Sequence, residues 1–363
     1  MTLTIGIDAR PATDESAGIG RVVRELLRAL ARRDDPHRYR LYAHTPWDEP
    51  ADARFAWRCS AAAEPEWHVR ASMVASRECD VFLSMGSYLP AWFARIPVVP
   101  VVYDLVPFHR DLLPQRRARL VARLTLGTAV RRAAAFVCIS EATRDDLVAR
   151  FPRARDSAVV ALLGGAPLLD APAARLPAGV PEGGFVLAVG TLEPRKNLPR
   201  LVAAYERLPG ELRAAHRLVV TGRLGWDSDA TLAALDGLGD DAVRTGFVPD
   251  DELALLYRRC ALFAYPSLGE GFGLPVLEAM AAGAPVLTSD RSSLPEVGGD
   301  AAAYCDPSDV ASIARALEGL LRDPGRRARM AAAGPPRAAA FSWDHTAAVV
   351  LETLERVAAA RAS

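Results

Sequence analysis

Short apolar runs alternate with amphipathic stretches along the chain, and this alternation constrains the fold more than any other feature of the sequence. In the first part of the chain, clear helical stretches at 20–33 and 141–150 separate the apolar runs. Strands that alternate with helices are typical of βαβ units, which build parallel sheets. The strands predicted in this series are 3–7, 39–43, 81–84, 98–103 and 135–139. We therefore predict a doubly wound α/β domain.

The pattern breaks at 164–184, a stretch rich in glycine and proline that we interpret as a linker, and then restarts. The second series of predicted strands is 185–190, 217–221, 243–245, 262–265 and 285–288. The fold class is therefore α/β, with two Rossmann-like doubly wound domains, and 363 residues suffice for two cores. We place the domains at 1–172 and 180–343, with a last helix at about 344–363 that packs back on the first domain. Open α/β sheets bind ligands beyond the carboxyl ends of their strands, so we expect a cleft between the domains.

The composition is that of an ordinary globular protein, with 50% hydrophobic and 24% charged residues. The cysteines are scattered and form no CxxC pair, which favours neither a disulfide framework nor a zinc site and suits a reducing compartment. They are Cys59, Cys79, Cys138, Cys260 and Cys305. No signal peptide or membrane-spanning run is evident, so we expect a cytoplasmic protein that is neither secreted nor integral to a membrane.

Charge is distributed unevenly, although the formal net charge is zero. Residues 1–178 carry 25 basic and 20 acidic side chains, whereas residues 179–363 carry 19 and 24. The stretch 110–132 interleaves arginines with leucines, which predicts either peripheral contact with an anionic membrane or a solvated helix face. Clustered lysines with interleaved aromatic residues are missing from the sequence, so we expect no nucleic-acid partner.

A glycine-rich turn follows the predicted strand 262–265, and a helix opens at Pro275, where proline suits the first helical position. The backbone amides of Gly273 and Leu274 and the positive end of the helix dipole favour an anion such as a pyrophosphate. Glu270 and Glu278 flank the turn and could accept hydrogen bonds from sugar hydroxyls. A glutamate at the start of a helix can also serve only to complement the dipole.

A second candidate segment, 190–197, follows the first strand of the C-terminal domain. Lys196 is the only lysine in the chain and Asn197 the only asparagine. Arginine takes the other cationic positions, so a compact ammonium here suits a task that a planar guanidinium cannot perform. We interpret Lys196, together with Arg195, as a phosphate-binding pair; the alternative is a solvated loop lysine.

The segments GEGFGLPVLEAM (269–280) and GTLEPRKN (190–197) resemble the signature of the large retaining glycosyltransferase family 4, also called group 1, typified by bacterial polysaccharide mannosyltransferases. The resemblance implies the GT-B architecture, in which two Rossmann-like domains face each other. It implies that Glu270 contacts the donor sugar, that Glu278 contacts the nucleotide ribose, and that Arg195 and Lys196 bind the donor phosphates. The turn residues that would lend backbone contacts are Gly271, Phe272, Gly273 and Leu274.

Further donor contacts rest on the same resemblance. Gly222, Phe247 and Val248 would bind the nucleobase, although a glycine at a strand end is more often a turn residue. Gly18 and Gly20 would lie across the cleft from Lys196. A dinucleotide-binding GxGxxG motif would require glycine where the chain has Val23, which disfavours an oxidoreductase.

The acceptor side departs from the family pattern. Many relatives carry a histidine just before Asp104, where this chain has Tyr103. Asp104 could accept the proton of the acceptor hydroxyl or simply hold its loop. Ser140 is interpreted as a helix N-cap rather than a catalytic residue.

No cofactor and no metal are expected. Asp227-Ser228-Asp229 has the form of a metal-binding DxD, but Asp229 is a natural N-cap for the helix that follows, and the resemblance implies no essential metal.

The resemblance implies a retaining hexosyltransferase that moves a sugar, such as mannose or a related hexose or deoxyhexose, from a nucleotide sugar. It favours a GDP-sugar as the donor, with UDP- and dTDP-sugars as alternatives, and a glycan or lipid-linked saccharide as the acceptor, in surface polysaccharide (lipopolysaccharide) synthesis. The alternatives are a nucleotide-sugar epimerase, an oxidoreductase and a non-catalytic sugar-nucleotide-binding module.

Overall fold

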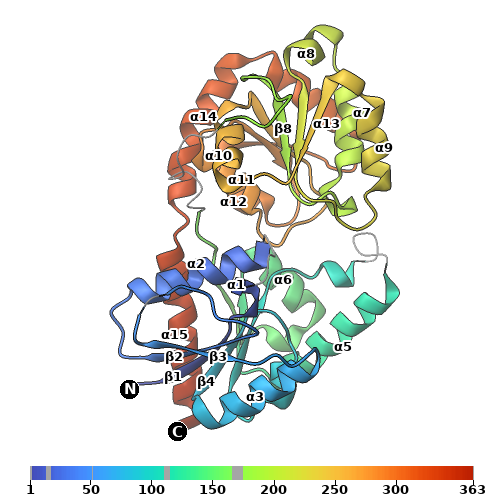
Figure 1. Ribbon diagram of the computed structural model, residues 1–363. Coiled ribbons are helices and arrows are strands. Elements are labelled where there is room, and N and C mark those ends of the chain that lie inside the picture. The colour runs from blue at the N-terminus through green and yellow to red at the C-terminus, as the bar shows by residue number, and fades with distance from the viewer. Residues whose placement is uncertain (1, 14–17, 51, 110–114, 166–174, 363) are drawn as a thin grey trace. The chain divides into compact units, whose positions relative to one another are not determined.

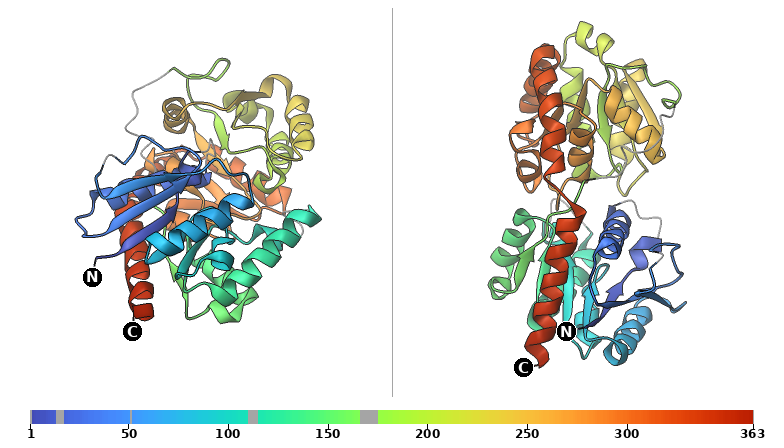
Figure 2. Two further views of the ribbon diagram at one scale, coloured as in Figure 1. Left: turned by 60° about the horizontal axis from the view of Figure 1, so that its bottom comes forward. Right: turned by 90° about the vertical axis from the view of Figure 1, so that its left-hand side faces the viewer.

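The chain divides into two compact units in the computed structural model (Figures 1 and 2), which describes residues 2–13, 18–50, 52–109, 115–165 and 175–362. The N-terminal unit comprises Met1–Gly164 and Ser342–Ser363, and the C-terminal unit comprises Gly165–Phe341. Each unit has its own parallel sheet, which confirms the predicted α/β fold class of two Rossmann-like domains. Part of the predicted linker, 166–174, lies outside the described residues.

The N-terminal unit contains a seven-stranded parallel sheet in the order β3-β2-β1-β4-β5-β6-β7. Its strands are β1 (Thr4–Asp8), β2 (Arg38–Ala43), β3 (Phe55–Cys59), β4 (Val81–Ser84), β5 (Val98–Val102), β6 (Phe136–Cys138) and β7 (Ala158–Val160). The order reverses between β1 and β4, and such a switch point is where doubly wound sheets bind ligands. The sequence did not predict the two edge strands, β3 and β7, because they are short and only partly buried, so their apolar signal is weak.

Helices cover the N-terminal sheet. They are α1 (Arg10–Thr13), α2 (Gly18–Arg32), α3 (Glu66–Glu78), α4 (Pro90–Phe93), α5 (Arg116–Arg132), α6 (Glu141–Arg150) and α15 (Trp343–Ala362), with short 3-10 turns η1 (Val106–Phe108) and η2 (Pro152–Ala154). The last helix, α15, packs against α2, as Figure 1 shows in red beside blue. Arg32 Nη2 lies 2.6 Å from Asp344 Oδ1, and His37 Nε2 lies 2.8 Å from Glu355 Oε1. The end of the chain therefore belongs to the N-terminal unit.

The C-terminal unit contains a six-stranded parallel sheet in the order β10-β9-β8-β11-β12-β13. Its strands are β8 (Val186–Val189), β9 (Leu218–Thr221), β10 (Ala242–Gly246), β11 (Leu262–Tyr265), β12 (Val286–Ser289) and β13 (Ala302–Cys305). Its helices are α7 (Leu198–Glu206), α8 (Gly210–Ala215), α9 (Asp229–Gly237), α10 (Asp250–Arg259), α11 (Leu274–Ala281), α12 (Leu294–Gly298), α13 (Val310–Leu321) and α14 (Pro324–Ala339), with 3-10 turns η4 (Pro194–Lys196), η5 (Gly239–Asp241) and η6 (Gly299–Ala301). The edge strand β13 was not predicted from the sequence.

One local prediction in this unit is wrong. Helix α9 begins at Asp229 itself, and Ser228 occupies the N-cap position without a capping side-chain hydrogen bond. The backbone turns at Asp227, which has a φ of 52°, so Asp229 falls inside the first helical turn. Its charge can complement the helix dipole there, but its side chain does not cap the helix.

Three glycines with positive φ end adjacent strands of the C-terminal sheet. Gly190 follows β8 (φ 140°), Gly222 follows β9 (φ 148°), and Gly246 ends β10 (φ 74°). A Cβ atom on Gly222 would lie 1.9 Å from the carbonyl oxygen of Gly190, and the amide of Gly222 donates to the carbonyl of Gly246 at 2.8 Å. Only glycine permits this backbone conformation and this close approach. The three glycines therefore hold the loops at the carboxyl edge close together.

None of the described helices is both long enough and apolar enough to cross a membrane.

The glycine contact predicts a specific loss of stability. Gly222→Ala should destabilise the C-terminal unit by about 3 kcal/mol or more, because the Cβ must displace a backbone carbonyl and adopt a strained φ. Gly319→Ala on helix α13 is the matched control: its Cβ meets nothing within 4 Å, so it should stabilise by up to about 1 kcal/mol. Denaturant unfolding of both variants measures the difference, and equal stability would contradict the packing described.

Candidate active site

The loop after β8 is fixed by Asn197, the only asparagine of the chain. Asn197 adopts a left-handed conformation (φ 61°, ψ 27°), which asparagine tolerates better than most residues. Its side-chain amide is buried and donates to the carbonyls of Pro266 (2.9 Å) and Pro307 (2.7 Å). The amide therefore joins the loop after β8 to the loop after β11. This places Arg195 and Lys196 beside the glycine-rich turn.

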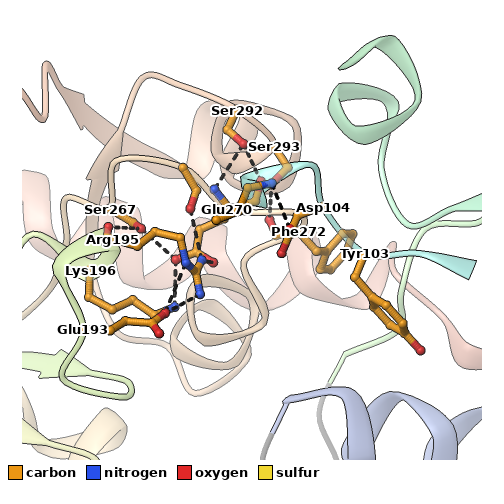
Figure 3. A network of polar contacts seen from close by, with 12 residues as sticks. Tyr103, Asp104, Glu193, Arg195, Lys196, Ser267, Glu270, Phe272, Ser292 and Ser293 are labelled. Atoms are coloured by element: carbon orange, nitrogen blue, oxygen red, sulfur yellow. Dashed lines mark hydrogen bonds and ion pairs between the residues drawn. The ribbon is translucent and has the colours of Figure 1, made fainter. Parts of the chain in front are cut away.

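A carboxylate, that of Glu270, lies at the centre of the resulting network (Figure 3). Its Oε1 accepts hydrogen bonds from Lys196 Nζ (2.7 Å), Tyr265 Oη (2.8 Å) and Ser267 Oγ (2.7 Å). Its Oε2 pairs with Arg195 Nη1. The Glu270 side chain is only 8% exposed, so both of its oxygens are engaged inside the protein. The sequence predicted that Glu270, Lys196 and Arg195 belong to one site, and the structure brings them into direct contact.

The charged groups of this network, together with burial, change the pKa values of its members. Burial opposes ionisation of Glu270, but the neighbouring Arg195 and Lys196 cations outweigh it and lower its pKa to about 2. Burial lowers the pKa of Lys196, which the carboxylate of Glu270 opposes. Burial and the Glu270 charge raise the pKa of Tyr265 well above its usual range. Tyr265 is therefore a neutral hydrogen-bond donor and Glu270 an ionised acceptor at neutral pH.

A second carboxylate balances Arg195. Glu193 Oε1 accepts hydrogen bonds from Arg195 Nη2 at 2.7 Å and from Nε at 3.1 Å. Arg195 Nη1 also donates to the carbonyl of Gly269 at 3.0 Å. The guanidinium thus links the loop after β8 to the start of the glycine-rich turn. No role was predicted for Glu193, Tyr265 or Ser267, although each lies at or just beyond the end of a predicted strand.

The glycine-rich turn leads directly into α11, which begins at Leu274. Gly273 occupies the N-cap position with a φ of 110°, and a Cβ there would lie 2.7 Å from Leu294 Cδ2. Ser293 Oγ donates to the carbonyls of Phe272 (2.8 Å) and Glu270 (2.9 Å). The turn is therefore held from the far side by the loop after β12, so its shape is set before any ligand binds. The sequence assigned no position in the site to Ser293.

Glu278 lies in helix α11 and forms a hydrogen bond that is separate from the Glu270 network. It is 5% exposed, and its Oε2 accepts a hydrogen bond from Tyr257 Oη at 3.0 Å. Helix α11 thus carries a buried carboxylate that Tyr257 orients. Its contact with a ribose stays a prediction.

The predicted base-binding residues lie at the ends of β9 and β10. Phe247 is 56% exposed, and the Arg223 guanidinium lies 4.4 Å from the centroid of its ring. Val248 is buried, and Gly222 lies between the two strand ends. Phe247 therefore presents an aromatic face at the carboxyl edge of the sheet, with a cation stacked on it.

The remaining predicted residues belong to the N-terminal unit. Gly18 is exposed as the first residue of α2, and Gly20 is buried in its first turn. Asp104 Oδ1 accepts a hydrogen bond from the Val106 amide at 3.0 Å, which is compatible with a loop-holding role and leaves the proton-accepting role untested. Ser140 Oγ accepts from the Thr143 amide at 3.0 Å, which confirms the predicted N-cap.

The N-terminal unit also contains a buried ion pair that the sequence analysis missed. Asp8 ends β1 and is fully buried, and its two oxygens each accept from Arg10 at 3.0 Å. The Arg10 guanidinium lies 4.1 Å from the Trp67 ring centroid. The pair lies at the β1–β4 switch point, where a Cβ on Gly86 would approach both side chains. The sequence signal for this pair was Asp8, a charged residue at the end of a predicted buried strand.

Family comparisons agree with both units. Residues 178–337 match the family described as "Glycosyl transferases group 1", and residues 16–162 match "Glycosyltransferase Family 4". The two matches together span most of the chain. The chain belongs to the group 1, or family 4, glycosyltransferases.

The chain is similar to curated proteins over part of its length. It is 43% identical to an O-antigen chain mannosyltransferase B of Escherichia coli over 164 residues, which are 45% of this chain and 43% of that protein. It is 34% identical to a D-inositol 3-phosphate glycosyltransferase of Rhodococcus jostii over 51% of this chain and 43% of that protein. The matches thus span less than half the length of these relatives.

Solved structures show the same fold at low sequence identity. A sucrose-phosphate synthase from Thermosynechococcus elongatus has a TM-score of 0.76 at 18% identity, covering 98% of this chain and 99% of that chain. HepE from Anabaena, solved in complex with UDP-glucose, has a TM-score of 0.75 at 17% identity and covers 98% and 100%. These similarities establish the GT-B fold.

Within the part of the chain that the structure describes, no group of three histidine, cysteine or carboxylate side chains is arranged to hold a metal ion.

Titration of Glu270 predicts a pH-dependent contribution to stability. Because its pKa is lowered in the folded state, the stabilisation is complete above about pH 4.5 and is lost as the pH falls towards 2. Glu270→Gln, which removes this partner from two partly buried cations, should lower the free energy of unfolding by about 3 kcal/mol at pH 7, and this difference from wild type should narrow between pH 5 and pH 2. Denaturant unfolding across this range tests it, with exposed Glu206→Gln as the control. If the difference in unfolding free energy between Glu270→Gln and wild type does not change with pH, the neighbouring cations do not lower the pKa of Glu270.

Proposed function

We propose that this chain is a retaining, metal-independent glycosyltransferase that transfers a sugar from a nucleotide-diphosphate sugar to a hydroxyl of a glycan or lipid-linked saccharide. The observation that carries the proposal is the buried contact of Glu270 with Lys196 and Arg195, directly beside the N-terminus of α11. Two cations and a helix N-terminus next to a preformed turn suit a diphosphate. The family match of this unit supports the same use.

The cations would stabilise the departing nucleotide. Negative charge grows on the diphosphate as the glycosidic bond breaks, and Lys196, Arg195 and the α11 amides would counter that charge at fixed positions. Glu270 would orient both cations, since each pairs with its carboxylate. Prior orientation lowers the reorganisation that the reaction requires.

Glu270 is poorly suited to be a covalent nucleophile. Hydrogen bonds from Lys196, Tyr265 and Ser267 converge on one of its oxygens, Arg195 pairs with the other, and a pKa of about 2 makes it a weak base. We therefore infer same-face substitution, in which an oxygen of the donor diphosphate helps to remove the acceptor proton. Retention follows because the acceptor attacks from the face that the leaving group vacates.

The donor that we favour is a GDP-sugar such as GDP-mannose. The supporting observation is the 43% identity to a protein described as an O-antigen chain mannosyltransferase. UDP- and dTDP-sugars are the alternatives, and one structural neighbour was solved with UDP-glucose. By the same similarity, the acceptor would be a growing surface polysaccharide, and the scattered cysteines suit a reaction in the cytoplasm.

Removing the lysine tests the proposed transfer. Lys196→Ala should lower kcat by at least about a hundredfold, because a fixed cation at the leaving group is lost, while the fold is retained. Transfer from GDP-mannose to a polysaccharide primer is measured together with the melting temperature, with exposed Arg207→Ala as the control. Wild-type transfer in Lys196→Ala would refute the role. If the chain epimerises the nucleotide sugar in the absence of an acceptor, the epimerase alternative is favoured. If NAD(P) raises its melting temperature, the oxidoreductase alternative is favoured.

Phe247 should determine how tightly the nucleotide binds. Stacking of a base on an aromatic ring is worth roughly 1–3 kcal/mol, so Phe247→Ala should raise the donor KM about tenfold or more with little change in kcat. Leu224→Ala is the matched control, because Leu224 is 62% exposed near the same strand ends. Thermal shifts with GDP-, UDP-, dTDP- and CMP-sugars would identify the donor class. If the nucleotide sugar raises the melting temperature of Phe247→Ala as much as that of wild type, the Phe247 ring does not bind the base.

A further inference from the structure

An edge-to-face aromatic pair joins the glycine-rich turn to the end of the C-terminal unit. Phe272 of the turn and Phe341, the last residue of this unit, pack with their ring centroids 5.8 Å apart and their planes at 82°. Both residues are buried, with 3% and 8% of their surface exposed. Beyond Phe341 the chain continues into α15 of the N-terminal unit. The turn that leads into α11 therefore packs on the segment by which the chain leaves the C-terminal unit.

Arg337 of α14 fixes the Phe341 ring. Its guanidinium carbon lies 4.9 Å from the centroid of that ring. The same guanidinium donates from Nε to the carbonyl of Val297 at 3.0 Å and from Nη2 to the carbonyl of Glu296. Both carbonyls belong to the last residues of α12, where a cation can donate to the carbonyls and complement the helix dipole. One guanidinium thus joins the Phe341 ring to the carboxyl end of α12.

Helix α12 also holds the backbone of Phe272. Its N-cap residue, Ser293, donates from Oγ to the Phe272 carbonyl at 2.8 Å (Figure 3). The beginning of α12 therefore contacts the backbone of Phe272, and the end of α12, through Arg337, holds the ring that packs on the Phe272 side chain. Phe272 is fixed by its backbone and by its ring at the same time.

The backbone around Phe341 is fixed as well. The amide of Gly165, where the chain enters the C-terminal unit, donates to the Phe341 carbonyl at 3.2 Å. Helix α14, which precedes Phe341, packs directly on the backbone of α11, because a Cβ atom on Gly334 would lie 2.8 Å from the Met280 carbonyl oxygen. Phe341 is thus held at its ring and at its backbone, so it can serve as a fixed support for the turn.

We propose that Phe341 is a positioning residue of the candidate active site: its contact with Phe272 keeps the glycine-rich turn in the conformation that receives the diphosphate of a nucleotide. This inference rests on the proposed function for the identity of that ligand. A turn that is already in place need not be ordered when the nucleotide binds, so the aromatic pair lowers the cost of binding. An edge-to-face pair contributes a factor of about three to ten to such an equilibrium.

Replacing the ring tests the positioning role. Phe341→Leu keeps an apolar side chain but removes the aromatic pair, so GDP and UDP should bind about three- to tenfold more weakly in calorimetric titrations. Phe185→Leu is the matched control, because Phe185 is fully buried in the same unit and precedes β8, at the edge of the sheet opposite the glycine-rich turn. The control should also have a lower melting temperature than wild type, but it should bind nucleotide as wild type does.

A double variant tests whether Phe341 acts through Phe272. Phe272→Leu/Phe341→Leu should bind nucleotide no more weakly than Phe272→Leu alone, because the second ring has already lost its partner. In the transfer assay, Phe341→Leu should raise the donor KM by the same three- to tenfold factor and leave kcat within about twofold, since the turn is ordered once the donor is bound. A loss of folded enzyme would lower kcat instead.

Hydrogen exchange in the free protein distinguishes a failure of this inference from a failure of the proposed function. Without ligand, the amides of residues 271–274 should exchange at least about threefold faster in Phe341→Leu than in Phe185→Leu or wild type. The inference is overturned if the two variants exchange alike, if they bind nucleotide alike, or if the Phe272 and Phe341 substitutions weaken binding independently. If wild type binds neither GDP nor UDP, the proposed function fails and the ligand assigned to the turn fails with it, whatever the exchange rates show.

Discussion

The candidate active site depends on one buried charge, the carboxylate of Glu270. An ionised group inside a protein is costly unless it is paired and hydrogen-bonded, and Glu270 meets both conditions through Lys196 and Arg195 together with hydroxyl donors. These partners come from the loops after β8 and β11, so satisfying one carboxylate fixes the relative positions of both loops. The same contacts hold the two cations beside the start of α11.

Backbone geometry makes that convergence possible. The glycines that end β8, β9 and β10 adopt positive φ, and the contact of Gly222 with the Gly190 carbonyl leaves no room for a side chain. Asn197 adds a left-handed turn whose amide joins the loops after β8 and β11. Because glycines stand at the points of contact, these loops pack closely. They bring backbone groups and charged side chains of neighbouring residues to one edge of the sheet, where a doubly wound domain binds its ligand.

Arginine serves two different purposes in the N-terminal unit. Arg10 is buried and held by the Asp8 carboxylate, so its charge is neutralised inside the protein and contributes to the order of the β1–β4 switch point. Arg123 and Arg131 of helix α5 are exposed, and their charge is directed to the solvent. The difference lies in the carboxylates that the fold brings near each guanidinium, and it separates a buried structural cation from a solvated one.

The sequence by itself determined the fold class and the centre of the candidate active site. Central strands are buried on both faces and therefore carry a strong apolar signal, and the motifs around Lys196 and Glu270 are contiguous in the chain. Tertiary structure decided what depends on distant segments: the half-buried edge strands β3, β7 and β13, the Glu270 partners Tyr265 and Ser267, and the Asp8–Arg10 pair. Periodicity reports burial along one segment, whereas hydrogen bonds and ion pairs depend on which segments the sheet order places together.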